Sequence, residues 1–74
     1  MNAMWFVGVR IDTGSKIAIA ESDVKTVSIH EDGLRVAFCE PNGKISVFGL
    51  DTPTVRCVNS SEMLRFMRGE EVKP

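Results

Sequence analysis

The side chains best suited to chemistry are a single histidine, His30, and two cysteines, Cys39 and Cys57. A cysteine and a histidine act as nucleophile and base only when they lie within hydrogen-bond distance. His30 and Cys39 fall on the two strands of a predicted hairpin. The register expected for it sets His30 opposite Arg35 and separates the thiol from the imidazole by about 13 Å. We expect no dyad there, and an approach of Cys57 to His30 would depend on tertiary packing.

The spacing of these residues also disfavours a metal site. Seventeen residues separate the two cysteines, and neither a C-x2-C nor an H-x3-H motif is present. The acidic pairs Glu31-Asp32 and Glu70-Glu71 are expected at a hairpin tip and in a tail, where solvated carboxylates are poor general acids. No glycine-rich phosphate-binding motif occurs. We therefore predict a protein that is not an enzyme and carries no metal or cofactor.

The elements that position these side chains are predicted to be mainly β. Apolar and polar residues alternate with period two over most of the first two-thirds of the chain, which is typical of half-buried strands. The sequence predicts a five- to six-stranded antiparallel meander, curled or barrel-like, with one short C-terminal helix. The predicted strands cover residues 5–11, 16–20, a hairpin over 24–39, and residues 44–48 and 55–58.

The hairpin over residues 24–39 carries the clearest turn signal. Asp32-Gly33 is a favoured type I′ pair, because aspartate and glycine tolerate positive φ. A two-residue loop there sets Ile29 opposite Val36 and Val27 opposite Phe38. The four apolar side chains then share one face, which we expect to be buried.

The next reversal, Pro41-Asn42-Gly43, leaves two registers open. A two-residue Asn42-Gly43 loop would point Ile45 and Val47 inward, and this is the register we favour. A type I turn with Gly43 as a bulge would point Phe48 inward instead.

Signals for the helix lie at both of its ends. Asn59 is a good N-cap, Glu62 occupies the third helical position, and Gly69 follows the last turn. They predict a helix over about residues 60–68, with an apolar stripe that must dock on the sheet. The stripe consists of Met63, Leu64, Phe66 and Met67.

The 74 residues are predicted to form one domain, 1–74, in which residues 70–74 are a flexible tail. The apolar run over residues 3–9 is far shorter than the roughly 20 residues of a membrane-spanning helix. It also lacks the features of a signal peptide. We expect no membrane association and a cytoplasmic location, where both thiols would be reduced.

Surplus apolar side chains indicate a partner surface. Two lie on or just before the first predicted strand and two at or just after the end of strand 44–48, all on faces opposite to the predicted core. One sheet face can be covered by the helix or by barrel closure, and covering both needs more protein than this chain contains. We therefore predict a homo-oligomer, a dimer or larger, or a complex with another protein, formed through an apolar sheet face or an edge strand. The predicted surface is Met4, Phe6, Phe48 and Leu50.

The alternative function is binding of nucleic acid, or regulation, through Arg10, His30 and Arg35 on one outer sheet face. The charge balance disfavours it, since nine basic residues face ten acidic ones and the net charge is −1. Proteins that bind duplexes usually carry a basic excess.

Overall fold

The computed structural model describes residues 3–70 and contains two antiparallel three-stranded sheets and one helix. The first sheet places β1 (Met4–Val9) between β2 (Lys16–Ala20) and β6 (Arg56–Asn59). The second sheet places β4 (Gly33–Cys39) between β3 (Val24–His30) and β5 (Ile45–Leu50). Short 3-10 helices, η1 (Glu21–Asp23) and η2 (Thr52–Thr54), link the sheets, and α1 (Ser60–Arg68) follows β6. The predicted mainly β class with a C-terminal helix is confirmed.

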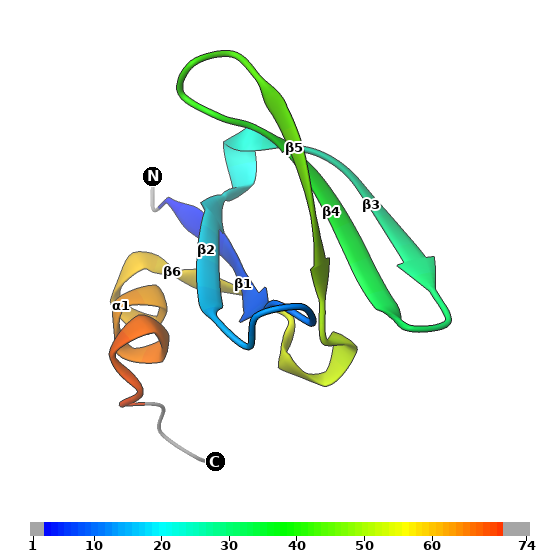
Figure 1. Ribbon diagram of the computed structural model, residues 1–74. Helices are drawn as coiled ribbons and strands as arrows, with labels where there is room; N and C mark the ends of the chain where they lie inside the picture. The colour runs from blue at the N-terminus through cyan, green and yellow to red at the C-terminus, as the bar shows by residue number, and fades with distance from the viewer. Residues whose placement is uncertain (1–2, 71–74) are drawn as a thin grey trace.

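The chain changes sheets twice. It leaves β2 through η1 to enter the second sheet, and it returns from β5 through η2 so that β6 pairs with β1 (Figure 1). The two sheets also meet through backbone contacts beyond the end of β1. Arg10 forms a bridge with Leu50, and the Ile11 N–H donates to the Gly49 carbonyl at 3.0 Å. At this corner the backbones of the two sheets are joined by hydrogen bonds.

The core has two parts, one on each face of the first sheet. The first forms where α1 packs on the sheet, around Val7, Val58 and Phe66. The second lies between the sheets, around Ile19, Val36 and Leu50, and it includes Phe6 and Phe48. The alternating side chains of β1 therefore serve both parts. The expectation that this chain is too small to cover both faces of a sheet is wrong, because the helix covers one face and the second sheet covers the other.

The helix has the predicted ends. The Asn59 side chain accepts a hydrogen bond from the Glu62 N–H at 2.9 Å, and Gly69 ends the helix with φ of 76°. Of the predicted tail, residues 71–74 lie outside the described residues. Glu70 is held in place, because its N–H donates to the Arg65 carbonyl at 2.8 Å and its carboxylate pairs with Arg68 at 3.2 Å.

The register of the β3–β4 hairpin differs from the predicted one by two residues. Its loop is Glu31-Asp32, so Ile29 pairs with Leu34 and Val27 pairs with Val36. No described residue other than glycine has positive φ, which rules out a type I′ turn with Asp32 at its centre. A shift of two residues keeps the same side chains on the same face. That face is nevertheless not buried along its whole length, because Ile29 is 82% exposed.

The β4–β5 connection adopts the register that was not favoured. Gly43 has φ of 86°, and its N–H donates to the Glu40 carbonyl at 2.8 Å, as in a type I turn followed by a glycine bulge. Phe48 therefore pairs with Val36 and points into the core between the sheets. The side chains that point outward instead are Ile45, 52% exposed, and Val47, 58% exposed.

Candidate functional site

The four side chains predicted to form a partner surface do not share one. Leu50 is fully buried, and Phe6 and Phe48 are half-buried in the core between the sheets. Only Met4, at the start of β1, is exposed, at 37%. The reason is that the second sheet covers the face that these side chains were expected to offer to a partner.

The most exposed apolar side chain of the described residues lies on β3. Ile29 is 82% exposed and its neighbour on the same face, Val27, is 44% exposed. Their partners on β4, Leu34 and Val36, are half-buried and buried. The loss of burial across one strand spacing shows that the first sheet covers β4 but not the far part of β3. In Figure 1, β3 lies on the side of the second sheet away from β2.

The outer edge of β3 is also open. β3 is the terminal strand of its sheet and pairs with β4 along one edge only. Within residues 3–70, no backbone hydrogen bond outside the strand ladders involves residues 25–30. Alternate residues of an edge strand direct their N–H and C=O groups away from the sheet, so this edge presents unpaired donors and acceptors. An open edge beside exposed Val27 and Ile29 is the candidate interaction site, which we call the β3 edge.

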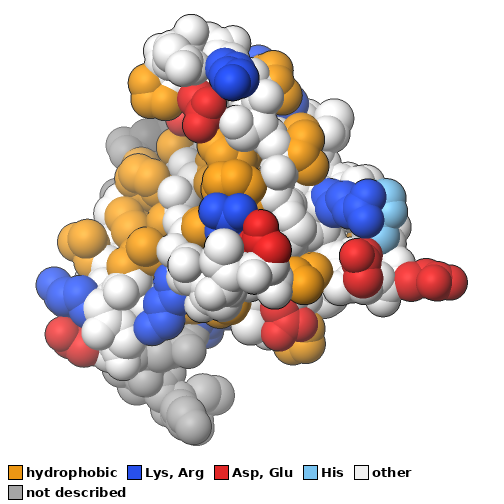
Figure 2. Space-filling view, viewed as in Figure 1, with side chains coloured by type: hydrophobic (Ala, Val, Ile, Leu, Met, Phe, Trp, Pro, Cys, Tyr) orange, Lys and Arg blue, Asp and Glu red, His pale blue; other side chains and the backbone are white. Residues whose placement is uncertain are grey.

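Two of the three residues considered for nucleic-acid binding lie near the hairpin tip, beside acidic groups. Ser28, and not His30, pairs with Arg35, and the Ser28 hydroxyl and the His30 ring are 3.0 Å apart. The Arg35 guanidinium lies 3.5 Å from the Asp32 carboxylate. In Figure 2 the histidine, in pale blue, lies close to both basic and acidic side chains. The tip is therefore a mixed polar surface.

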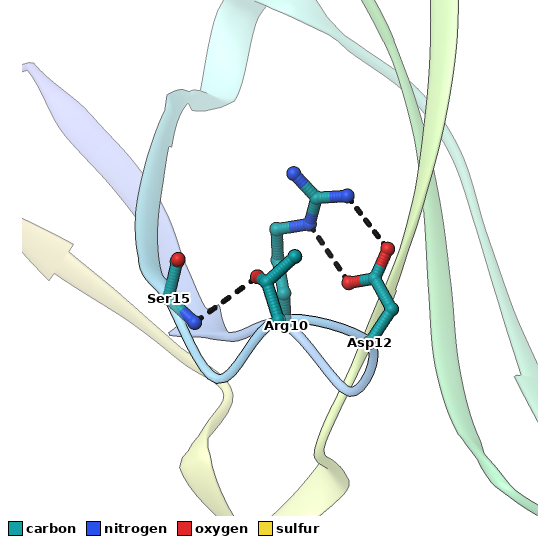
Figure 3. Close-up of polar contacts among 4 residues, drawn as sticks. Arg10, Asp12 and Ser15 are labelled. Carbon is teal, nitrogen blue, oxygen red and sulfur yellow. Dashed lines mark hydrogen bonds and ion pairs between the residues drawn. The ribbon is translucent and has the colours of Figure 1, made fainter.

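Arg10, the third residue considered for nucleic-acid binding, lies at the corner where the two sheets meet. Its guanidinium donates two hydrogen bonds to Asp12, at 2.7 and 3.1 Å (Figure 3). The same group lies 4.1 Å from the centre of the Phe48 ring. The hydrogen bond from Arg10 also holds the pKa of Asp12 below its ordinary value. Arg10 thus covers the core aromatic and neutralises its neighbour. No observation in the structure favours nucleic-acid binding through the predicted residues.

The two cysteines lie on different sheets and are both free thiols. The Cys57 thiol donates a hydrogen bond to the Glu21 carboxylate at 3.3 Å, and the Cys39 thiol contacts the Glu40 carbonyl at 3.6 Å. Desolvation raises the pKa of Cys57, and the hydrogen bond and negative charge of Glu21 raise it further. Within the described part of the chain, no group of three or more histidine, cysteine or acidic residues could hold a metal ion.

The contact with Glu21 predicts a slow thiol at Cys57. A raised pKa leaves less thiolate near neutral pH, and the thiolate is the reactive form. In a Cys39→Ser background, Glu21→Gln is expected to speed alkylation of Cys57 by iodoacetamide several-fold at about pH 8. Asp23→Asn is the matched control, because it removes the same charge from the same 3-10 helix without that hydrogen bond. Equal rates in both variants would contradict the assignment.

A feature that the sequence did not predict is a shallow cleft between the first sheet and α1. Lys16 of β2 and Arg56 of β6 both reach over Phe66, with Nζ 5.5 Å and Cζ 5.7 Å from the ring centre. Both distances fit cation–π contacts that cover a buried aromatic ring. The sequence alone does not signal this pairing, since it depends on β2 and β6 flanking the same strand.

Taken together, the sheets, the helix and the open edge define a small antiparallel β domain. No protein-family model, no curated protein and no solved structure matches the chain. None of the helices within residues 3–70 has both the length and the apolar character needed to cross a bilayer.

Proposed function

We propose that this domain is a non-enzymatic interaction module that associates with a second copy of itself through the β3 edge. The observation that carries the proposal is the 82% exposure of Ile29 on a strand whose outer edge has no partner among residues 3–70. Such an edge is a template for pairing with another strand, and natural proteins usually protect it. Adding a strand satisfies the backbone groups and covers the apolar side chains beside them.

A second copy is the partner that this edge fits best. The two ends of β3 carry opposite charges. Lys25 lies near its start, and Glu31 comes directly after its end. An antiparallel pair of identical strands brings the start of one against the end of the other, which a closed two-fold dimer requires. One added strand pair is a small interface, so we expect association that is weak and depends on concentration.

The test is the mass of the protein in solution with and without a charge on the β3 edge. Size-exclusion chromatography with light scattering, at loading concentrations up to about 500 µM, is expected to show a dimer that dissociates on dilution. Ile29→Glu is expected to give a monomer with an unchanged circular dichroism spectrum, because the side chain is exposed. Phe6→Glu is unsuitable, since Phe6 packs in the core.

Leu64→Glu is the matched control for this test. Leu64 is 49% exposed on α1, so the same type of substitution is made on a surface away from β3. The Leu64 variant should dimerise like the unmodified protein. A monomer at every concentration, or an Ile29→Glu protein with the mass of the unmodified one, would overturn the proposal.

A further inference from the structure

The residues of β3, together with Glu31 directly after it, are complementary to themselves when the strand is paired antiparallel. We infer that two copies pair through β3 about a two-fold axis at Ser28. In this register Lys25 faces Glu31 of the second copy, and Val27 faces Ile29 of the second copy. The inference rests on the proposed self-association and adds its register and its charge pairing.

The first constraint on the register comes from the two faces of the strand. Cross-strand neighbours point to the same side of a sheet. An axis between two residues would place Val27 against Ser28 or Ile29 against Ser28, and would join the apolar inner face of one copy to the polar outer face of the other. Only an axis at a residue keeps both faces continuous across the pair.

The second constraint comes from which side chains face each other when the two-fold axis passes through Val27, Ser28 or Ile29. An axis at Val27 sets Lys25 against Ile29, and an axis at Ile29 sets Val27 against Glu31. Each arrangement puts a charge beside an apolar side chain. The axis at Ser28 is the one of the three that pairs charge with opposite charge and apolar with apolar, and it does so twice by symmetry.

The structure leaves these two charges available. Within residues 3–70, neither Lys25 nor Glu31 takes part in an ion pair, and both are exposed. The register shift between Val24 and Thr26 leaves Lys25 without a partner residue on β4. The same charges oppose stacking of parallel strands in register, which would superpose Lys25 on Lys25 and Glu31 on Glu31. They therefore favour a closed pair over an open-ended fibre.

A charge-exchange experiment tests the register. Lys25→Glu and Glu31→Lys each turn two attractive contacts into two repulsive ones, and each is expected to weaken the dimer about tenfold in sedimentation equilibrium. The double variant Lys25→Glu/Glu31→Lys should return to within about threefold of the unmodified protein, because the pairs are restored. The differences should shrink in 1 M salt. Lys44→Glu in the β4–β5 turn is the control for net charge and should leave the dimer unchanged.

A crosslinking experiment tests the position of the axis directly. In a Cys39→Ser/Cys57→Ser background, Ser28→Cys places each new thiol opposite its own copy, so mild oxidation should give a disulfide-linked dimer. Thr26→Cys is the matched control. In this register the two Thr26 positions are offset by four residues, about 13 Å, which is beyond disulfide reach.

The outcomes separate this inference from the proposed function. If the unmodified protein is monomeric at every concentration, both fail. If it is a dimer that Ile29→Glu dissociates, the β3 edge stands. In that case, single charge variants with unchanged affinity, or Thr26→Cys crosslinking as well as Ser28→Cys, would overturn the register. A tenfold loss, rescue by the double variant and crosslinking at Ser28 alone would support it.

Discussion

Replacing Gly33 with alanine is expected to cost about 3–6 kcal/mol, a large share of the total stability of this domain. Gly33 opens β4 with φ of +147°, a conformation that other residues rarely adopt. A Cβ atom there would lie 2.5 Å from the Leu50 carbonyl oxygen and 2.6 Å from Cδ1 of Ile11. The Ile11 side chain can move, but the Leu50 carbonyl is backbone of the neighbouring strand. A chain of 74 residues has a total stability of about 4–11 kcal/mol, so the variant would be near its unfolding threshold.

Urea denaturation followed by circular dichroism measures this effect. Gly14→Ala is the matched control, because Gly14 has φ of +74° but a Cβ atom added there would meet no other atom within 4 Å. The free energy of unfolding of Gly14→Ala should fall by only about 1–2 kcal/mol, because alanine disfavours a positive φ. Equal losses for the two variants would show that the contact with Leu50 does not limit residue 33.

The second large effect is expected from Leu50→Ala. Leu50 is fully buried between the sheets, where it packs with Val36 and Ile19. Truncating a buried leucine removes its transfer free energy and leaves a cavity, at a cost of about 2–5 kcal/mol. For a domain of this size, that loss lowers the melting temperature by at least about 8 °C.

Thermal unfolding of Leu50→Ala and Leu64→Ala distinguishes the effect of burial from the effect of the leucine-to-alanine substitution itself. Both remove the same atoms, but Leu64 is 49% exposed on α1, where alanine is also a good helix former. The Leu64 variant should lie within about 1 kcal/mol of the unmodified protein. A loss below 1 kcal/mol for Leu50→Ala would contradict the placement of Leu50 in the core.

The parts of the fold that the sequence predicted correctly are those encoded locally. The helix begins and ends where Asn59 and Gly69 cap it, because capping groups are satisfied by backbone only a few residues away. The bulged turn at Gly43 was one of two alternatives that the turn residues allowed, and packing selected between them. Phe48 fills the space beside Val36 and Phe38, its ring 5.1 Å from that of Phe38.

An edge strand was one of the two kinds of surface that the sequence led us to expect, and its use for association stays a proposal. Of the four residues named for that surface, Leu50 is buried and Phe6 and Phe48 are half-buried, because exposure depends on which strands lie opposite each other. The alternation of β1 does not reveal that a second sheet covers Phe6. Nor does the pattern of β3 reveal that the first sheet stops short of Ile29. Strand order between segments far apart in the chain decides both.

The reactive side chains show the same contrast between what near neighbours in the sequence determine and what the tertiary structure determines. The sequence alone shows that the two cysteines and the histidine lack the spacing of a metal site. It also predicts that a series of strands is followed by a capped helix. Both conclusions depend only on residues close together in the sequence. Three other features exist only in the folded molecule: the contact of Cys57 with Glu21, the position of Gly33 under the Leu50 carbonyl, and the open edge of β3. These depend on how two sheets pack, and packing joins residues that no local pattern relates.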